Sequence, residues 1–293
     1  MEKLLIIDGS NLLFQMFFGM PARIVNHQGK AIQGALGFVG AVLKIIRKVE
    51  PSHIIAVFDG EHENERRELD SVYKANRIDY SAVCEEENPF SQLQDIYDAL
   101  DYLEIKRIET TDCEADDMIA GYALSMGRQM EVIISSFDSD FFQLITDKVS
   151  VLRYRGEKTM ICTPEYLIER FGILPEQYAE YKSLTGDAAD NIKGAEKVGP
   201  KTAAMLLKEF GTLENIIANA ADIRKLSVKE SIIRNAEKLR LNYMMIKLGD
   251  YKRLPYSKQE LEYRYEGITT NEVLKGIGLR QEDDGRNGNK YKI

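Results

Sequence analysis

The chain has 293 residues, of which 44% are hydrophobic and 29% charged, and its formal net charge is −8. This apolar content suffices for one large or two modest cores, and two domains are expected. No apolar run approaches the roughly 20 residues of a membrane span, and no signal-peptide pattern precedes the first strand pattern, so a soluble, cytoplasmic protein without a membrane partner is predicted.

Cysteine and histidine are both rare. Cys84, Cys113 and Cys162 are odd in number and widely spaced, which fits neither a disulfide framework nor a zinc site, so reduced thiols are expected. The chain has only 3 histidines. Any metal is therefore predicted to be a hard cation held by oxygen atoms.

Positive charge is concentrated in one stretch. Residues 191–253 hold 13 Lys and Arg against 7 Asp and Glu, a surplus of 6, which leaves −14 on the rest of the chain. Such a division suits a protein in which one part holds phosphates and another gathers carboxylates around metal ions. An ordinary solvated surface explains the same charges equally well.

Two apolar runs near the N-terminus each end in an aspartate. Residues 4–7 lead into Asp8 at the start of an expected loop, and residues 54–58 lead into Asp59, with a helical pattern at 36–49 between them. This order predicts a right-handed βαβ unit in a parallel sheet covered by helices on both faces. Ligands of open α/β sheets bind outside the carboxyl ends of the strands, so both acids are expected at that edge.

The pattern of strands and helices continues to about residue 162. Charges of both signs at residues 60–87 interrupt it and predict a mobile excursion outside the core. Further predicted elements are a helix at 93–103, strands at 105–108 and 132–134, and a closing hairpin of 149–154 with 159–162. Strand signals then largely cease, which places a domain boundary near residue 169.

Five more acids accompany these elements. Glu114, Asp116 and Asp117 stand just before an apolar helical run, and Asp138 and Asp140 follow a buried strand. The helix dipole favours acids in a first turn, so an acidic helix start explains the first three without any function. Acids at the ends of separate strands favour a shared cation site instead.

Helical patterns fill the second half, at residues 164–171, 175–184 and 201–210. Asp187 and Asp190 are expected in a loop between helices, and residues 198–203 read as a hairpin that opens a helix. Pro200 suits the first helical position, and Gly199 would let the backbone approach a phosphate at the helix N-terminus. A plain turn is the alternative for this hairpin.

Seven motifs in the same order give the chain its resemblance to a known family. They are Ile7-Asp-Gly-Ser-Asn11, Phe58-Asp59, Tyr73-Lys-Ala-Asn-Arg77, Glu114-Ala-Asp-Asp117, Asp138-Ser-Asp140, Leu184-Thr-Gly-Asp-Ala-Ala-Asp-Asn-Ile192 and Val198-Gly-Pro-Lys-Thr-Ala203. Together they resemble the 5′-nucleases of bacterial polymerase I N-terminal domains, phage 5′-nucleases and flap endonucleases. The length leaves no room for polymerase or proofreading domains, so the free-standing bacterial form is expected.

The resemblance implies an α/β fold with a mostly parallel, PIN-like central sheet flanked by helices over residues 1–169. It also implies a helical arch at about residues 60–90 and a helical C-terminal domain over residues 170–293, with a helix–hairpin–helix element and a loose tail.

The resemblance further implies a two-metal centre. One divalent ion would be held by Asp8, Asp59, Glu114 and Asp116, and the other by Asp117, Asp138, Asp140, Asp187 and Asp190. Mg²⁺ is the expected ion, with Mn²⁺ as a substitute, and the reaction would be in-line phosphodiester hydrolysis without a protein nucleophile.

The arch would supply the cations Lys74, Arg66 and Arg77 near the scissile phosphate. Tyr73 would stack on an unpaired base, with a half-buried packing tyrosine as the alternative. Glu65 and a run of nearby glutamates depart from the family pattern, which predicts weaker or more selective threading of the 5′ end.

The hairpin would grip duplex DNA and hold K⁺ on its carbonyl oxygens, although Lys197 stands where glycine is usual. Its DNA-binding residues would be Gly194, Lys197, Val198, Gly199, Lys201 and Thr202.

The expected function is a structure-specific 5′ nuclease acting on DNA 5′ ends and flaps, and on RNA–DNA primer junctions, in replication and repair. Two alternatives stay open: a nucleic-acid-binding homologue that has lost catalysis, and a phosphatase with Asp8 as its nucleophile. The phosphatase would usually need a second aspartate two residues later, where Ser10 stands.

Overall fold

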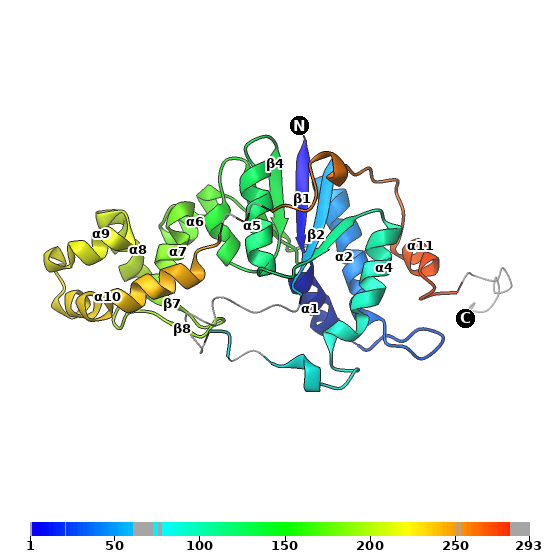
Figure 1. Ribbon diagram of the computed structural model, residues 1–293, viewed down its shortest axis with the longest axis horizontal. Helices are drawn as coiled ribbons and strands as arrows, with labels where there is room; N and C mark the ends of the chain where they lie inside the picture. The colour runs from blue at the N-terminus through cyan, green and yellow to red at the C-terminus, as the bar shows by residue number, and fades with distance from the viewer. Residues whose placement is uncertain are drawn as a thin grey trace, which may run out of the picture.

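The fold was obtained as a computed structural model, which describes residues 2–20, 22–60, 73–75, 78–249, 251 and 253–281 (Figure 1). The strands are β1 Lys3–Asp8, β2 His53–Phe58, β3 Lys106–Glu109, β4 Glu131–Ser135, β5 Val149–Arg153, β6 Met160–Cys162, β7 Gly186–Asp187 and β8 Ile192–Lys193. The α-helices are α1 Gly9–Gly19, α2 Gln33–Val49, α4 Leu93–Tyr102, α5 Ala115–Met126, α6 Pro164–Phe171, α7 Tyr178–Thr185, α8 Pro200–Phe210, α9 Leu213–Ala218, α10 Leu226–Ile246 and α11 Thr270–Gly276. Short 3-10 helices are η1 Tyr80–Ala82, η2 Pro89–Gln92, η3 Asp140–Leu144, η4 Pro175–Gln177, η5 Ala220–Asp222 and η6 Gln259–Leu261.

A six-stranded sheet in the order β3-β2-β1-β4-β5-β6 forms the centre of the molecule. The first five strands are parallel, and β6 returns antiparallel to β5 as the predicted closing hairpin. Every residue of β2 is buried, as a parallel sheet covered on both faces requires. The structure thus confirms the predicted mostly parallel sheet flanked by helices.

Each face of the sheet has its own core. Leu4 and Ile6 of β1 belong to one buried cluster and Leu5 and Ile7 to the other, because successive strand side chains point to opposite faces. Helices α1, α2 and α4 cover the second face, and α5 covers the first. Complete burial of each such aliphatic side chain contributes roughly 1.5–3 kcal/mol.

The loop predicted after Asp8 is wrong, because α1 begins directly at Gly9. The Asp8 carboxylate caps this helix by accepting a hydrogen bond from the Asn11 N–H at 3.0 Å. Five of the eleven residues of α1 are Leu or Phe, and Leu12, Leu13 and Phe17 are buried. The Asp-Gly-Ser-Asn stretch, which was predicted to be a loop, is therefore the capped start of a helix.

The predicted helices at 164–171 and 201–210 are confirmed to within one residue, and the predicted helix at 175–184 is a 3-10 turn, η4, that leads into α7. Gly172 (φ 73°) and Gly211 (φ 84°) follow α6 and α8 with left-handed backbone, and Pro200 opens α8. The stretch expected as a plain loop around Asp187 contains the short antiparallel pair β7–β8. Within the described residues, no helix is long and apolar enough to cross a bilayer.

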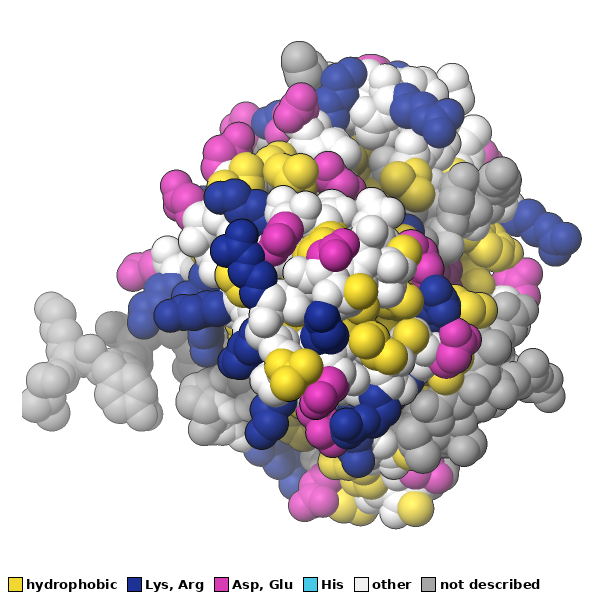
Figure 2. Space-filling view, turned by 90° about the vertical axis from the view of Figure 1, so that its left-hand side faces the viewer, with side chains coloured by type: hydrophobic (Ala, Val, Ile, Leu, Met, Phe, Trp, Pro, Cys, Tyr) yellow, Lys and Arg dark blue, Asp and Glu magenta, His cyan; other side chains and the backbone are white. Residues whose placement is uncertain are grey.

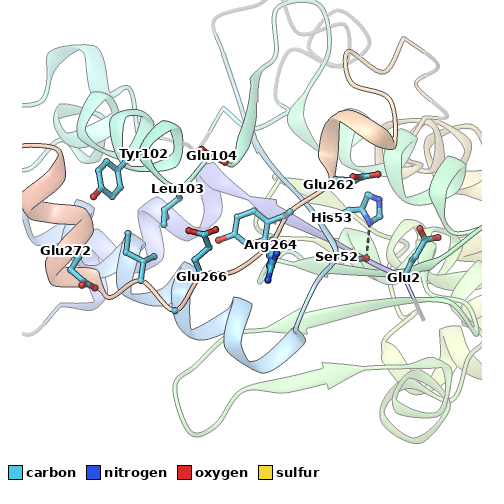
Figure 3. Close-up of a pocket in the computed structure, with 13 residues that line it drawn as sticks. Glu2, Ser52, His53, Tyr102, Leu103, Glu104, Glu262, Arg264, Glu266 and Glu272 are labelled. Carbon is cyan, nitrogen blue, oxygen red and sulfur yellow. Dashed lines mark hydrogen bonds between the residues drawn. The ribbon is translucent and has the colours of Figure 1, made fainter.

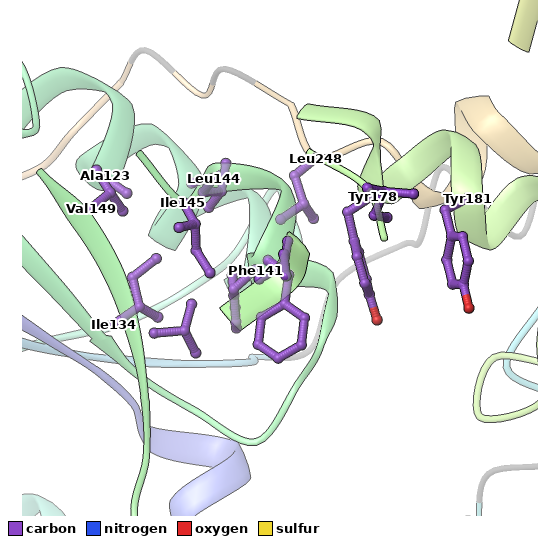
Figure 4. Close-up of a cluster of buried hydrophobic side chains, with 14 of the residues drawn as sticks. Ala123, Ile134, Phe141, Leu144, Ile145, Val149, Tyr178, Tyr181 and Leu248 are labelled. Atoms are coloured by element: carbon purple, nitrogen blue, oxygen red, sulfur yellow. The ribbon is translucent and has the colours of Figure 1, made fainter. Parts of the chain in front are cut away.

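The core of the first face continues into the second half of the chain. Figure 4 shows Phe141 and Ile145 between the strand residue Ile134 and the helical residue Tyr178, all in one buried cluster. After α10 the chain returns to the sheet, where the Tyr263 N–H donates to the Ser52 carbonyl oxygen at 2.8 Å. Helix α11 packs on α2 and α4. The division at residue 169 stays a prediction.

Candidate active site

Three acids lie where β1, β2 and β4 end, at one edge of the sheet. Asp8 is 5% exposed, and its Oδ2 accepts a hydrogen bond from Ser136 Oγ at 2.6 Å. The same hydroxyl oxygen accepts the Asp138 N–H at 2.9 Å. Asp59 Oδ1 accepts the Ala115 N–H at 2.9 Å, which ties the end of β2 to the start of α5. The parallel sheet thus gathers the carboxylates as predicted.

These acids and Asp116 of α5 affect one another electrostatically. Burial, together with the neighbouring charges of Asp59 and Asp138, raises the pKa of Asp8 to about 7, despite hydrogen bonds from Ser136 and Asn11 that lower it. Burial also raises the pKa of Asp116 well above its usual range, with Asp138 as the next cause. Such mutual repulsion is relieved by a bound cation or by protons. We call Asp8, Asp59, Asp116 and Asp138 the first group.

Glu114, at the N-terminal end of α5, pairs with a lysine beside the first group. Its Oε1 lies 2.7 Å from Lys74 Nζ, and the two side chains are 8% and 7% exposed. Lys74 has a left-handed backbone (φ 53°), and its N–H donates to the Asp190 carbonyl oxygen at 3.1 Å. The predicted catalytic lysine is therefore held between two parts of the site.

Three other acids form a tighter second group. Asp140, Asp187 and Asp190 each place one carboxylate oxygen within 4.8 Å of the other two. Asp140 follows Asp138 closely, since its N–H donates to Asp138 Oδ1 at 2.8 Å. In the part of the chain that is described, this is the one such set of three or more possible metal ligands. The oxygens of the first group are more widely spaced, which suits an ion that retains waters.

The sequence prediction missed Lys182, which is ion-paired with Asp140 and Asp187. Burial lowers the pKa of Lys182, but the two carboxylates raise it more, so the ammonium group stays charged. A signal was available: Lys182 stands one helical turn after the apolar Tyr178, on the buried face of α7. Ser136 was also missed, although it lies between a strand end and Asp138.

Asp117 is not one of the three acids of the second group. Its Oδ1 accepts the Gly249 N–H at 2.8 Å, where the chain leaves α10. Its assignment to the second ion stays a prediction.

The arch is described only in part. Arg66 and Arg77 lie outside the described residues, as do all of residues 61–72 and 76–77 of the predicted excursion. Tyr73 is 3% exposed and packs with Ala179, Ile192 and Met245, so its ring is not available to an unpaired base in this structure. The predicted stacking role of Tyr73 is corrected to the packing alternative.

The hairpin residues divide into buried and exposed members. A Cβ atom at Gly194 would lie 2.4 Å from the Leu184 carbonyl oxygen, so this glycine serves packing, and the Val198 side chain is only 5% exposed. The close packing leaves no space for a side chain at Gly194, and the DNA-binding assignment of both residues, which would act through the backbone, stays a prediction. Gly199 has open space around it. Lys197 is exposed with φ 65°, a backbone conformation that favours glycine.

Exposed cations surround this hairpin. Figure 2 shows many Lys and Arg side chains along one side of the end formed by α8, α9 and α10. Those that are exposed on the hairpin and the helices after it include Lys193, Lys197, Lys201, Lys208, Arg224, Lys225, Arg234 and Lys238. Thr202 is half-buried beside Lys201. The Gly194 carbonyl oxygen, a predicted K⁺ ligand, accepts a hydrogen bond from Lys238 Nζ at 3.3 Å.

A groove of about 820 Å³ lies at the opposite edge of the sheet, where β1 and β2 begin (Figure 3). Five glutamates line it together with the cation Arg264 and with His53, whose pKa is lowered by burial. Such a surface repels a polyanion, so nucleic acid is not expected in this groove.

Two family profiles match almost the whole chain. One, described as 5′-3′ exonuclease, N-terminal resolvase-like domain, covers residues 3–172, and the other, 5′-3′ exonuclease, C-terminal SAM fold, covers residues 173–268. The chain is 35% identical to thermostable DNA polymerase I of Thermus thermophilus over 82% of its own length and 28% of that protein. It is 33% identical to DNA polymerase I of Bacillus subtilis, over 79% of this chain and 26% of that one. It thus spans about a quarter of these relatives.

Solved structures give the same match over nearly full length. A T5 5′-exonuclease with bound zinc superposes with a TM-score of 0.71 at 25% identity, covering 86% of this chain and 91% of that one. The T5 D15 protein co-crystallised with metal ions gives 0.70 at 26% identity, over 84% and 89% of the two chains.

Proposed function

Because the chain belongs to the 5′-3′ exonuclease family, we propose that it is a structure-specific nuclease that hydrolyses phosphodiester bonds at 5′ ends and 5′ flaps of DNA. The observation that carries this proposal is the meeting of two carboxylate groups at one edge of the sheet, linked through the Asp138–Asp140 hydrogen bond. Replication and repair are the processes in which such junctions arise, and RNA–DNA primer ends are included as substrates.

The donor set fits hard divalent ions. All members of both groups offer carboxylate oxygens, which Mg²⁺ prefers and Mn²⁺ accepts. The first ion would be held by Asp8, Asp59, Glu114 and Asp116, and the second by Asp117, Asp138, Asp140, Asp187 and Asp190. When bound, two such ions would activate a water molecule and neutralise charge on the scissile phosphate and the departing oxygen.

The protein's own residues prepare this site. The Ser136 hydroxyl group orients the Asp8 carboxylate by donating to it, and it holds the backbone of Asp138 by accepting the Asp138 N–H. Lys74 holds Glu114, and with Arg66 and Arg77 it would place positive charge near the scissile phosphate.

Duplex DNA would lie along the exposed cations of the hairpin and α8, with Lys197, Gly199, Lys201 and Thr202 closest to its backbone. K⁺ at the hairpin is part of the proposal, in competition with Lys238 for the Gly194 carbonyl oxygen. A cytoplasmic location is proposed too, in keeping with three free cysteines.

A nucleic-acid-binding homologue with weak catalysis is the second candidate, favoured by the lysine that already pairs with the second group. Cleavage separates the two. The test incubates a labelled 5′ flap, a nicked duplex and a single strand with Mg²⁺, Mn²⁺ or excess chelator. We expect metal-dependent release of products with 5′-phosphates, mainly from 5′ ends at junctions.

Asp8→Asn should abolish this cleavage, whereas Asp147→Asn, which changes an exposed acid elsewhere, should leave it unchanged. Undiminished cutting in chelator, or binding of the flap without any cutting, would end the nuclease proposal.

A further inference from the structure

Lys182 is buried inside the acidic site although lysine is rarely buried. Its side chain is 9% exposed, and it forms ion pairs with both Asp140 and Asp187 of the second group. With Lys74 it is one of two lysines that are buried among the described residues, and each serves one part of the site. Lys74 pairs with Glu114, and among the described residues no lysine bridges two acids of the first group.

We propose that Lys182 is a built-in counterion of the second group: its ammonium group occupies the position between Asp140 and Asp187 in the metal-free protein and leaves Asp187 when a divalent ion binds there. This inference rests on the proposed function, because it concerns the second of the two metal positions.

Charge supports this assignment. Three carboxylates with oxygens within 4.8 Å of one another repel strongly when they are partly desolvated. Because Lys182 bridges two of the three, it supplies one positive charge at the position where an ion would contact both oxygens. A divalent ion must therefore displace the ammonium group or bind against its repulsion, and either effect weakens binding at this position.

The surroundings allow the lysine to move while its helix stays fixed. The Asn242 side-chain amide donates to the carbonyl oxygens of Ser183 at 3.1 Å and Lys193 at 3.0 Å, which ties α7 to α10 and the hairpin. The four-carbon stem of lysine has several rotatable bonds. The ammonium group can thus keep Asp140, on η3, and release Asp187, on β7.

The protein should therefore have two ion sites of different affinity when no DNA is bound. The first group should bind an ion without competition from Lys182, and the second should bind one at least tenfold more weakly. The displaced ammonium group could then form an ion pair with a phosphate of the nucleic acid. Binding of the second ion would thereby be coupled to binding of the substrate.

The test titrates the full chain with Mn²⁺ in the absence of DNA. Binding is measured by calorimetry and, independently, by the electron paramagnetic resonance signal of the Mn²⁺ that remains free. In Lys182→Met we expect the weaker site to tighten at least tenfold and the tighter site to stay within twofold. Lys182→Arg retains the charge and should keep the second site weak. Equal second-site affinity in Lys182→Met and the parent would overturn the inference.

A charge-free variant could also fold poorly, because three close carboxylates then lack the positive charge of the lysine. Lys182→Gln, which can still donate a hydrogen bond to Asp140, is the second variant. Its melting temperature should fall in chelator, and Mn²⁺ should raise it by more than in the parent. An equal Mn²⁺-induced rise would contradict the counterion role. Absence of all Mn²⁺ binding by the parent would overturn the proposed function as well, which distinguishes the two failures.

Discussion

Lys74 Nζ lies 2.7 Å from Glu114 Oε1, while the backbone N–H of the same lysine donates to the Asp190 carbonyl oxygen at 3.1 Å. One residue therefore contacts the start of α5 with its side chain and the loop of the second group with its backbone. A substitution of Lys74 should therefore alter both parts of the site.

The first prediction concerns this ion pair. Lys74→Met removes the cation that pairs with the buried Glu114 carboxylate, and breaking a buried pair costs about 3–5 kcal/mol of folding free energy. Single-turnover flap cleavage should fall at least tenfold, while duplex affinity measured in Ca²⁺ should change less. Chemical denaturation in chelator checks the stability loss.

Adding Glu114→Gln to Lys74→Met removes the unpaired buried negative charge, so it should restore part of the stability. It should not restore the cleavage. Lys48→Met, which changes an exposed lysine on α2, is the control and should behave like the parent. Parent-rate cleavage by Lys74→Met would show that the lysine serves folding alone.

The second prediction is a dependence of stability on pH in chelator. Burial raises the pKa of Asp8 from 3.8 to about 7, so the folded protein binds this proton more tightly than the unfolded chain. The protonated Asp8 side chain therefore stabilises the fold at low pH, and this contribution to the free energy of unfolding is lost as the pH rises from about 4 to 7. By linkage the loss amounts to about 4 kcal/mol at most.

Melting temperatures of the parent in chelator should accordingly fall between pH 5 and pH 8, and Asp8→Asn should fall less over the same interval. Saturating Mg²⁺ should flatten the parent's profile, because the ion takes the place of the proton. Identical slopes for parent and Asp8→Asn in chelator would rule Asp8 out as the titrating group.

Much of this site could be predicted from sequence because its carboxylates follow strands. Apolar runs ending at Asp8 and Asp59 suffice to place two acids at one sheet edge, since parallel strands share their direction. The acids of the second half of the chain were then predicted from the order of the motifs that carry the family resemblance. Local signals at Gly172 and Gly211 likewise predicted where helices end.

The missed features depend on contacts between distant segments. The helical spacing places Lys182 on the buried face of α7, but only the packing of α7 beside η3 brings its ammonium group to Asp140. Tyr73 reads as an aromatic residue of an exposed excursion, yet it packs against Ile246, far along the chain. Neither partner can be identified from spacing along the sequence.

The third prediction separates two hairpin glycines. Gly199 has no neighbouring atom within 4 Å of a built Cβ, so Gly199→Val should fold with little loss of stability but obstruct a DNA backbone. Duplex affinity should fall several-fold across a salt series measured by anisotropy. An unchanged affinity across salt would mean that the hairpin is only a turn.

Gly194→Ala is the matched comparison. Its Cβ would lie 2.4 Å from the Leu184 carbonyl oxygen and 2.5 Å from the Gly186 nitrogen, so the β7–β8 region must shift. The melting temperature should drop more than in Gly199→Val, while duplex affinity of the folded fraction should be less affected. The opposite ranking would reverse the roles assigned to the two glycines.

The last prediction tests whether the proposed second ion takes part in the chemistry, by changing two of its proposed ligands. Asp138→Asn with Asp187→Asn removes two negative charges with little change in size. The amide introduced by Asp138→Asn keeps an oxygen that can accept the Asp140 N–H, a bond of 2.8 Å in the parent, and Lys182 keeps its pair with Asp140, so folding should survive. DNA affinity in Ca²⁺ should stay the same or rise, because less negative charge faces the phosphates. Single-turnover flap cleavage should fall by roughly a hundredfold or more, because the double variant holds a second ion poorly.

Glu165→Gln with Asp147→Asn, which removes two exposed charges far from both groups, controls for net charge. If the double variant at the site binds and cleaves as the control does, Asp138 and Asp187 have no part in the reaction and the first ion alone must support it.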